Sequence, residues 1–312
     1  MSDLRHFTRE EIMAVDPAHV ADAMAAALGM VSRGAAVAPI RAHIDLGGGA
    51  GTFLISGVLN ELDLLTVKVI NVRPQNPSRG LERLQGSLTV FESSTGLPLA
   101  TMDARAATEA RTSACSAVSL RLLARADATV LTIFGTGPQA AGHLRALTRE
   151  REFADIRIVG RNTEAARALA AKHAGARPMA ADEAVRGAHV IVTATNSTSA
   201  LFPASAVESG THIAMVGSGS ATASEIEPQL LARAAAIRVD HRPTCLEESG
   251  EIVGALRAGL IDEAAVRELG EVVIGTAPGR TGPDDITIYK SVGNGTQDAA
   301  LASLLLGIGA RS

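Results

Sequence analysis

Thr129-Val-Leu-Thr-Ile-Phe-Gly-Thr-Gly-Pro-Gln-Ala140 is the stretch that decides the fold. Its first half is a short apolar run rich in strand formers, which predicts a buried strand. Its second half is a G-x-G-x-x-A turn, and residues 141–147 after it have the pattern of a helix. A strand, a glycine turn and a helix in this order are the context of a dinucleotide-binding fingerprint.

Each small residue of this turn has a physical role in such a site. Gly135 would permit the tight turn, Gly137 would let the backbone approach a pyrophosphate, and Ala140 would let the helix pack closely on the strand. The start of the helix that follows would offer free N–H groups and the positive end of its dipole to the phosphates, and Pro138 and Gln139 of the turn are further candidate cofactor contacts. The motif alone is equally consistent with an ordinary glycine-containing turn, but the flanking strand and helix favour a nicotinamide or flavin nucleotide site.

The end of the next strand is where this fold distinguishes NAD from NADP. A predicted strand over 155–160 is followed by Arg161-Asn162-Thr163, and a helix is expected over 164–173. An NAD site usually has an acid at this strand end, whereas a nearby arginine can bind the 2′-phosphate of NADP. No acid stands there, so Arg161, Asn162 and Thr163 favour NADP(H) over NAD(H). The alternative, that Arg161 is a solvated surface side chain, stays open.

The composition is that of an ordinary globular protein and argues against several classes of function. The 312 residues suffice for two domains, with 46% hydrophobic and 20% charged residues. The net charge of −4 and the aromatic content of 2% give no basis for nucleic-acid binding. Charged residues interrupt the alanine-rich runs, so no membrane span is expected, and the first residues have no signal-peptide core.

The cysteines and histidines form no recognisable site. Cys115 and Cys245 lie far apart without a C-x-x-C spacing, which predicts free thiols in a reducing compartment and hence a cytoplasmic protein. The histidines show no metal-ligand spacing, so no metal site is expected.

The N-terminal part of the chain predicts short helices followed by an antiparallel sheet. Thr8-Arg-Glu-Glu11 is a capping box, and Asp16-Pro17 begins a helix that is expected to reach Ser32. Beyond Pro39 the apolar pattern has the period of strands, with turn residues between the segments. The expected strands cover residues 40–46, 52–59, 64–72, 87–92 and 97–103, the last two forming a hairpin.

The rest of the chain predicts a doubly wound α/β domain of the Rossmann type with a parallel sheet. A helix over 104–124, capped by Asp103, leads into the glycine-turn strand, and further strands are expected at 190–194, 212–216 and 236–239. A strand over 285–290 and a helix over 297–306 close the chain. We therefore expect a Rossmann domain over 116–289 and an α+β domain built from 1–115 plus 290–312.

Three cations of the N-terminal domain stand out by their surroundings. Lys68 lies in Leu-Leu-Thr-Val-Lys-Val-Ile-Asn-Val, with apolar residues on both sides. A lysine in an apolar strand must find a partner or lose its charge, because burying an unpaired ammonium is expensive. Buried ionisable groups of this kind favour active sites. Arg41 in a strand and Arg111 on a helix are weaker candidates, since an arginine is often simply ion-paired at a surface.

With these residues in view, the chain resembles the ornithine cyclodeaminase/mu-crystallin family over nearly its whole length. The resemblance rests on four segments: Val67-Lys-Val-Ile-Asn-Val-Arg-Pro-Gln-Asn-Pro-Ser-Arg-Gly80, Glu109-Ala-Arg-Thr-Ser-Ala-Cys-Ser-Ala117, the glycine turn, and Asp285-Ile-Thr-Ile-Tyr-Lys-Ser-Val-Gly293. It implies a homodimer whose N-terminal sheet domain, completed by the C-terminal segment, binds substrate and forms the dimer interface. It also implies hydride transfer between a nicotinamide cofactor and a small amino acid or imino acid.

The resemblance also implies roles for individual residues. Arg41 and Arg111 would hold the substrate carboxylate, with Arg111 as a bidentate fork. Lys68 would contact that carboxylate or exchange a proton at the imine. The implied cofactor contacts are Thr112 near the phosphates, Ser291 near the nicotinamide, and Thr195, Val216 and Gly217 at strand ends.

One motif departs from the family pattern. Ornithine cyclodeaminases have Gly-x-Asp-x-Pro-Gly-Lys-x-Glu with a catalytic Asp, whereas this chain has Gly217-Ser-Gly-Ser-Ala-Thr-Ala-Ser-Glu225. Gly219 stands where that Asp would be, and Ala223 where the Lys would be. We therefore expect an NAD(P)H-dependent imine reductase or amino acid dehydrogenase that acts on a cyclic ketimine such as pyrroline-2-carboxylate. The alternatives are an ornithine cyclodeaminase and a non-catalytic binder of NADP or a small ligand.

Overall fold

The computed structural model describes residues 4–217 and 219–309, which form two compact units. The first, called here the N-terminal unit, combines residues up to Arg111 with the segment from Gly293 onwards. The second, called the Rossmann unit, runs from Thr112 to Val292. Each unit is described separately below.

The helices at the start of the N-terminal unit begin where the sequence predicts. Helix α1 (Arg9–Ala14) has a complete capping box, in which the Thr8 side chain and the Glu11 side chain each accept a backbone N–H of the other residue. Helix α2 (Pro17–Ser32) begins after Asp16, whose carboxylate accepts the Ala18 N–H at 2.9 Å. Both caps satisfy N–H groups that a helix start would otherwise leave without a partner.

The sheet of the N-terminal unit has the order β1-β7-β6-β5-β4-β2, with β3 also paired to β4. The five predicted strands are all present with slightly shifted ends, and the predicted hairpin is β6–β7. The expectation of a purely antiparallel sheet is wrong, because β1 pairs in parallel with β7. Strands β1 and β2 are too short to show a period in the sequence. The strands are β1 (Arg5–Phe7), β2 (Ala36–Val37), β3 (Ala42–Gly47), β4 (Ala50–Leu59), β5 (Leu64–Val72), β6 (Leu84–Glu92) and β7 (Pro98–Asp103).

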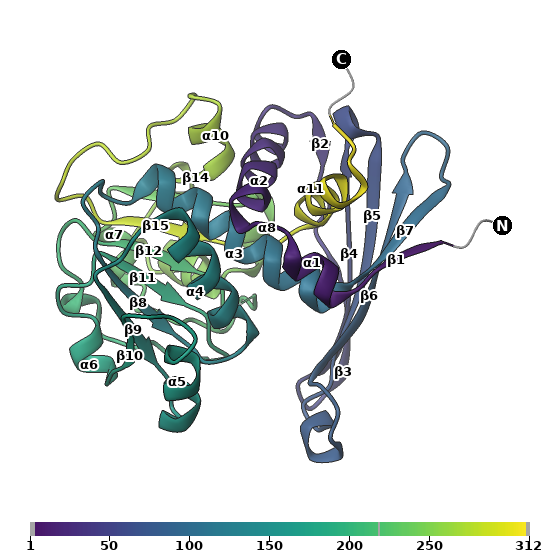
Figure 1. Ribbon diagram of the computed structural model, residues 1–312. Helices are drawn as coiled ribbons and strands as arrows, with labels where there is room; N and C mark the ends of the chain where they lie inside the picture. Colours follow the sequence, from purple (N-terminus) through teal and green to yellow (C-terminus); the bar gives the residue numbers. More distant parts are fainter. Residues whose placement is uncertain (1–3, 218, 310–312) are drawn as a thin grey trace. The chain divides into compact units, whose positions relative to one another are not determined.

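The C-terminal helix completes this unit. Helix α11 (Gly295–Leu306) packs against α2 and against β4 and β5 (Figure 1). At its first turn the Thr66 hydroxyl donates to the Gly295 carbonyl at 2.8 Å, which fixes the helix start over β5. Helix α3 (Ala104–Leu123), capped by the Asp103 side chain at Ala106 N–H, runs from this unit into the next.

The Rossmann unit is built on an eight-stranded parallel sheet with the order β10-β9-β8-β11-β12-β15-β13-β14 (Figure 1). The predicted strands are present, and the last of them, β15, lies inside the sheet between β12 and β13. Strands β10 and β14 were not predicted, because each has only three residues. The strands are β8 (Val130–Phe134), β9 (Asp155–Val159), β10 (Ala176–Pro178), β11 (Val190–Thr193), β12 (His212–Met215), β13 (Ala236–Val239), β14 (Val266–Glu268) and β15 (Thr287–Lys290).

The central strands of this sheet, β8, β11, β12, β15 and β13, are buried on both faces, as parallel strands usually are. Side chains from Phe134, Ile191, Ile213 and Ile288 belong to one large apolar core that includes residues of the covering helices. Those helices are α4 (Pro138–Glu150), α5 (Thr163–Ala170), α6 (Ala181–Ala184), α7 (Gln229–Ala232), α8 (Arg242–Glu248), α9 (Gly250–Arg257) and α10 (Leu269–Val273). In the described part of the chain, no helix has the length and hydropathy needed to cross a membrane.

Candidate active site

Lys68 is buried in the middle of β5, with an exposed fraction of 1%. Its Nζ lies 2.9 Å from Asp298 Oδ1 and 2.7 Å from Asp298 Oδ2, and it donates to the Thr108 hydroxyl at 3.2 Å. Burial lowers the pKa of Lys68 from its usual 10.5 to about 8, against the opposing effect of Asp298. Lys68 is therefore mostly protonated near neutral pH, and it gives up that proton more readily than an exposed lysine would.

Asp298 was not predicted from the sequence as part of the site. It lies in the first turn of α11, which begins after the cap residue Asn294, and it is completely buried. An acid in a first helical turn is commonly a solvated partner of the helix dipole, so its position alone gave no signal. The usable signal was that Gln297 and Asp298 are polar residues at the start of an otherwise apolar helix.

Arg111 reaches the same first turn of α11 from helix α3. Its Nη1 donates to Gln297 Oε1 at 2.7 Å, and its Nε lies 3.8 Å from Asp298 Oδ1. Nε is buried and makes no hydrogen bond to any residue that the structure describes. The guanidinium lies so close to Gly293 that a Cβ at that position would be 2.3 Å from Nη2. Gly293 therefore makes room for the arginine.

The sheet register brings Arg41 into the neighbourhood of Lys68. Arg41 directly precedes β3, whose Ala42 pairs with Leu54, and the next residue of β4, Ile55, pairs with Lys68. The Arg41 guanidinium lies over the Phe53 ring, 4.9 Å from its centroid. The positive charges of Arg111 and Arg41 both lower the pKa of Lys68 further. Lys68 and Arg111 thus share the one carboxylate of Asp298, which leaves an excess of positive charge, and the charge of Arg41 also acts on Lys68.

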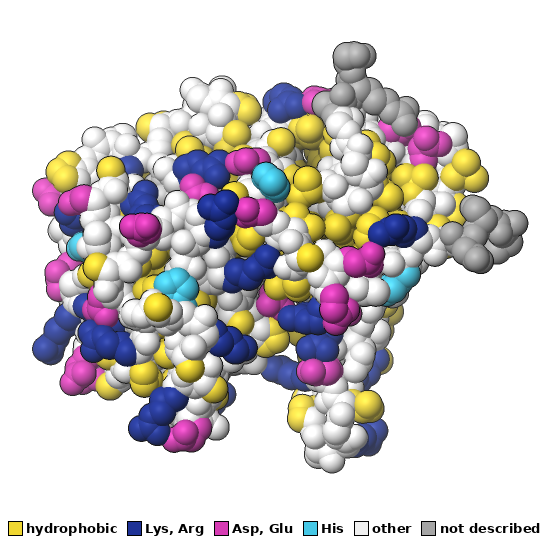
Figure 2. All heavy atoms as spheres, viewed as in Figure 1, with side chains coloured by type: hydrophobic (Ala, Val, Ile, Leu, Met, Phe, Trp, Pro, Cys, Tyr) yellow, Lys and Arg dark blue, Asp and Glu magenta, His cyan; other side chains and the backbone are white. Residues whose placement is uncertain are grey.

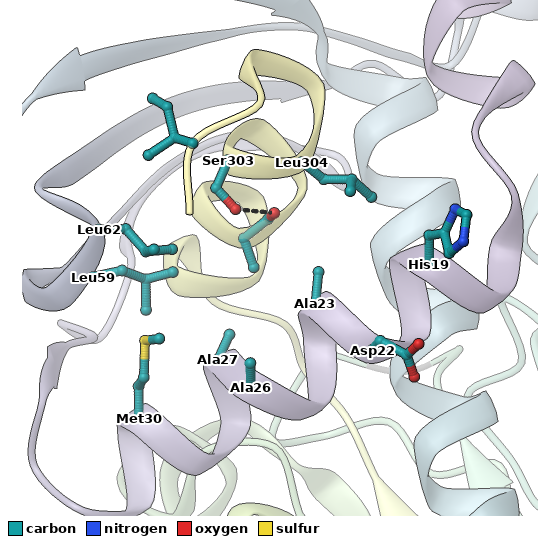
Figure 3. A pocket seen from close by; sticks show the side chains of 12 residues that line it. His19, Asp22, Ala23, Ala26, Ala27, Met30, Leu59, Leu62, Ser303 and Leu304 are labelled. Atoms are coloured by element: carbon teal, nitrogen blue, oxygen red, sulfur yellow. Dashed lines mark hydrogen bonds between the residues drawn. The ribbon is translucent and has the colours of Figure 1, made fainter. Parts of the chain in front are cut away.

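A separate apolar pocket of about 380 Å³ lies between α2, α11 and the end of β4 (Figure 3). Its polar side chains are His19, Asp22 and Ser303. The Ser303 hydroxyl donates to the Ala300 carbonyl at 2.8 Å. None of the sequence-predicted site residues lines it. The cluster of the buried Lys68, Arg111 and Asp298 with the half-buried Arg41, called here the cation cluster, is therefore the better candidate for chemistry in this unit.

The glycine turn of the Rossmann unit has the geometry that a dinucleotide requires. Gly135 has a φ of +123°, and a side chain there would place its Cβ 2.4 Å from the Ala194 carbonyl oxygen. Gly137 is the cap residue of α4, and no atom lies within 4 Å of the position its Cβ would take. Ala140 is buried against the strand. The backbone at the start of α4 is thus open to a phosphate.

A buried histidine holds the first turn of α4 in place. The His143 Nδ1 lies 2.7 Å from the Gln139 carbonyl oxygen, and its Nε2 lies 2.9 Å from the Ser116 hydroxyl. Burial lowers the pKa of His143 to about 4, so the ring is neutral. Since a carbonyl only accepts, the proton lies on Nδ1 and Ser116 donates to Nε2.

Four residues before Ser116 on α3, the buried Thr112 hydroxyl has no hydrogen-bond partner among the described residues, as is expected of a group that binds a ligand.

The residues after β9 are exposed, as a cofactor-selecting loop should be. Arg161, Asn162 and Thr163 are all accessible to solvent, and Asn162 caps α5 by accepting the Ala165 N–H at 3.1 Å. No acid occupies the strand end. Asn162 therefore has a structural role that the sequence analysis did not assign, while the Arg161 side chain is accessible to an anion.

Glu225, a buried acid that was not predicted as part of the site, binds the residues that follow β11 and β12. Thr195 and Gly217 both donate backbone N–H groups to the carboxylate of Glu225, and Val216 donates its N–H to Thr193. Gly219 is exposed and provides no ionisable side chain, and Ser218 lies outside the described residues. The acid in this segment thus binds the backbone of its own unit.

Ser291, after β15, is held by a second buried acid. Its hydroxyl donates to Asp240 Oδ2 at 2.8 Å, while Asp240 Oδ1 accepts the N–H groups of His241 and Val292. The Cys245 thiol donates to the same carboxylate, and burial, reinforced by Asp240, raises its pKa well above the usual value. The Ser291 hydroxyl proton is thus committed to Asp240, and Cys245 stays an unreactive thiol.

The charged side chains on one face of the molecule (Figure 2) are mixed in sign, and the described residues hold no metal cluster. On the face in Figure 2, Lys and Arg side chains are interspersed with Asp and Glu side chains. Over residues 4–217 and 219–309, no group of His, Cys, Asp and Glu is arranged to hold a metal ion. Cys115 and Cys245 are both buried free thiols.

The chain is similar to known proteins along most of its length. It is 40% identical over 237 residues to an uncharacterized cyclodeaminase of Sinorhizobium fredii, covering 73% of this chain and 71% of that one. It is 32% identical over 277 residues to a Delta(1)-pyrroline-2-carboxylate reductase of Bacillus cereus, covering 86% of this chain and 85% of that one.

A solved structure shows the same fold. The Delta(1)-pyrroline-2-carboxylate reductase of Thermococcus litoralis, in complex with NADH and L-proline, superposes with a TM-score of 0.90 at 28% identity, covering 99% of this chain and 100% of that chain. The model of the ornithine cyclodeaminase/mu-crystallin family matches residues 5–306. The expected membership is confirmed: the chain belongs to the ornithine cyclodeaminase/mu-crystallin family.

Proposed function

We propose that the protein is an NAD(P)H-dependent imine reductase that converts a cyclic ketimine carboxylate, such as pyrroline-2-carboxylate, into the amino acid. The observation that carries this proposal is the cation cluster, where two cations, Lys68 and Arg111, share the single carboxylate of Asp298 and the charge of Arg41 acts on Lys68. Such a cluster fits a small anion that also needs a proton. The pyrroline-2-carboxylate reductases among the relatives support this choice of substrate.

The residues of the cation cluster would divide the work at the substrate. Arg111, with a buried Nε that makes no hydrogen bond in the described structure, would bind the carboxylate with Arg41 and orient the ring. Lys68, with a pKa near 8, would give its proton to the imine nitrogen and would then take up a new proton from solvent. Asp298 would keep Lys68 protonated and aimed. The nicotinamide cofactor, when bound, supplies the hydride for the imine carbon.

The Rossmann unit would hold the cofactor. The open start of α4, the turn at Gly135 and the Thr112 hydroxyl fit its phosphates, and the strand ends near Thr195, Gly217 and Ser291 would lie along its nicotinamide half.

The exposed Arg161 supports a preference for NADP(H). NADPH should bind more tightly than NADH. Arg161→Ala should reduce the difference in binding free energy between the two cofactors by roughly 1–3 kcal/mol, the scale of charge-assisted hydrogen bonds. Fluorescence titrations of the unmodified protein and of Arg161→Ala with each cofactor measure this difference. Equal affinities for the two cofactors in the unmodified protein would refute the NADP assignment.

The direct test of the proposal is the loss of NADPH absorbance with a panel of cyclic imino acids. Pyrroline-2-carboxylate or a close homologue should be reduced at an easily measured rate. A protein that binds NADPH tightly but turns over no member of the panel would favour the rival hypothesis of a non-catalytic nucleotide or ligand binder.

Ornithine cyclodeaminase activity is the second candidate, and the cyclodeaminase among the relatives favours it. Oxidising ornithine requires a base that removes a proton from its amine, and Gly219 has no side chain to do so. We therefore expect little or no proline and ammonia from ornithine and oxidised cofactor. Release of both at a rate near that of ketimine reduction would make cyclodeaminase the better assignment.

We further infer a cytoplasmic homodimer formed through the sheet of the N-terminal unit. Side chains alternate between the faces of a sheet, so Ile44, Leu54 and Val67 share the face opposite to Lys68, and all three are exposed. An exposed apolar sheet face of this kind marks an interaction surface. Light scattering after size exclusion should give a dimer, and Val67→Glu should shift it to a monomer. A monomeric unmodified protein would refute the inference.

A further inference from the structure

Glu225 is buried completely and its carboxylate is saturated with donors. Oε1 accepts the Thr195 N–H at 2.8 Å and the Thr195 hydroxyl at 2.6 Å. Oε2 accepts the Thr193 hydroxyl at 2.8 Å and the Gly217 N–H at 3.0 Å. One side chain thus holds the ends of two neighbouring parallel strands, β11 and β12.

These strand ends lie beside the point where the chain stops adding strands on one side of β8 and continues on the other. Strand β8 has β9 on one side and β11 on the other, and ligands of open α/β sheets bind at the carboxyl ends of strands beside such a point. The link to the glycine turn is direct, because the Ala194 carbonyl oxygen occupies the space that a Gly135 side chain would need. Glu225 holds Thr195, Thr195 follows Ala194, and Ala194 contacts the turn.

Other buried groups fix Glu225 in turn. Its backbone N–H donates to Glu251 Oε1 at 3.1 Å, and Glu251 is paired with Lys290 Nζ at 3.1 Å. The Ser249 hydroxyl donates to Glu251 Oε2 at 2.9 Å. Gly217 is packed so tightly that its Cβ would lie 2.4 Å from Glu225 Oε1. Neither the carboxylate nor the loop can move without the other.

We propose that Glu225 is a positioning residue for the cofactor, which holds the loops after β11 and β12 in the arrangement that receives the dinucleotide beside the glycine turn. This rests on the proposed function, because it presupposes a nicotinamide cofactor in the Rossmann unit. Glu225 itself touches neither cofactor nor substrate. It acts through the backbones of Thr195 and Gly217.

Glu225→Gln is a sharp test because the amide has the same shape but only one accepting oxygen. Whichever way the amide is turned, its nitrogen faces one backbone N–H, that of Thr195 or that of Gly217. A backbone N–H cannot reverse its role, so one of the two loops must come free. We expect the Kd for the preferred cofactor to rise at least about 10-fold, the effect of losing one hydrogen bond to a charged group.

The matched control is Glu227→Gln. Glu227 lies two residues away and its carboxylate accepts the Ala204 N–H at 2.7 Å, in a turn that precedes β12. This variant should bind NADPH within about twofold of the unmodified protein, because the strand-end loops stay fixed. Hydrogen exchange without cofactor should accelerate at the Thr195 or Gly217 amide in Glu225→Gln alone. In turnover, the KM for cofactor should rise while the KM for the imino acid stays constant.

Fluorescence titration of the full chain with NADPH and NADH decides the outcome. If Glu225→Gln is folded by circular dichroism and keeps the original Kd, the positioning role is refuted. If that variant does not fold, Gly217→Ala replaces it, since the added Cβ forces the loop off an intact Glu225; weaker binding supports the role and unchanged binding refutes it. If the unmodified protein binds neither nucleotide, the proposed function itself fails.

Discussion

Each unit of the molecule contains a fully buried lysine paired with a buried carboxylate, yet the two clusters differ in their balance of charge. In the N-terminal unit, Lys68 and Asp298 approach to 2.7 Å, and the positive charges of Arg111 and Arg41 also act there. In the Rossmann unit, Lys290 and Glu251 approach to 3.1 Å, and a second carboxylate, Glu225, adjoins them. One cluster has surplus cations and the other surplus acid.

The surplus is resolved differently in the two clusters. The four donors described above on Glu225 are groups of the Rossmann unit itself, two of them backbone N–H groups, so this acid holds the chain. The buried Arg111 Nε, in contrast, has no hydrogen bond among the described residues. A buried salt bridge is weak evidence that a cluster stabilises the fold, so the ion pairs themselves do not separate the two clusters. What separates them is whether a buried N–H group is left to bind a ligand. By that criterion we propose that the cation cluster binds substrate and that the Glu225 cluster supports the cofactor loops.

Replacing the lysines separates the two roles, with the largest effects expected. Lys68→Ala should lower kcat for ketimine reduction at least about 100-fold, the scale of a positioned proton donor, and should leave cofactor affinity intact. The fold should survive because Arg111 still neutralises Asp298. Lys290→Ala should instead destabilise the fold by about 3–5 kcal/mol, because Glu251 is left buried without its cation.

The exposed Lys172 provides the control for both replacements. Lys172→Ala should change neither kcat nor the unfolding midpoint in urea. Near-normal turnover in Lys68→Ala would return Lys68 to a purely structural role and would remove the distinction between the clusters.

A smaller effect is expected from Gly293→Ala, which displaces Arg111 without altering it. The new Cβ would lie 2.3 Å from the Arg111 Nη2, so the guanidinium must move, and the KM for the ketimine should rise roughly 10-fold, the loss of one charge-assisted hydrogen bond. Gly307→Ala is the matched control, because Gly307 has a φ of +68° against +79° for Gly293, and nothing lies within 4 Å of its Cβ position. Both variants should lose about 1–2 kcal/mol of stability from the left-handed backbone, and only the first should change KM.

The smallest effect concerns pH. Protonated Lys68 is the proposed donor, so kcat/KM for reduction should fall as the pH rises through about 8, the pKa of this side chain. Asp298 raises that pKa, while burial, Arg111 and Arg41 lower it. Asp298→Asn should therefore move the fall in activity to lower pH. A shift to higher pH, or a profile that is flat between pH values of roughly 6 and 9, would assign the proton to another group.

The sequence located the cations but not the acids, and the reason is physical. A lysine within an apolar strand conflicts with its local environment, which made Lys68 visible. Asp298 and Glu225 occur in polar or capping surroundings where an exposed acid is ordinary. Only contacts between distant segments bury them, such as the hydrogen bond from Lys68 to Asp298 across 230 positions.

The same distinction applies to the fold. The capping box of α1, the glycine turn and the longer strands are determined by local sequence, and their positions were predicted within a few residues. Strand β1 exists because β7 offers it an edge, and β15 lies inside the parallel sheet because the chain returns there after residue 280. Neither arrangement follows from the period of the residues involved.

The central claim is that the cation cluster recognises a carboxylate, and discrimination between pyrroline-2-carboxylate and 1-pyrroline tests it most directly. The two imines differ only in that group. The unmodified protein should prefer the carboxylate by roughly 100-fold or more in kcat/KM, the scale of two charge-assisted hydrogen bonds, and Arg111→Met should reduce the preference to a few-fold. If a folded Arg111→Met variant keeps the full preference, the account of the cation cluster is contradicted.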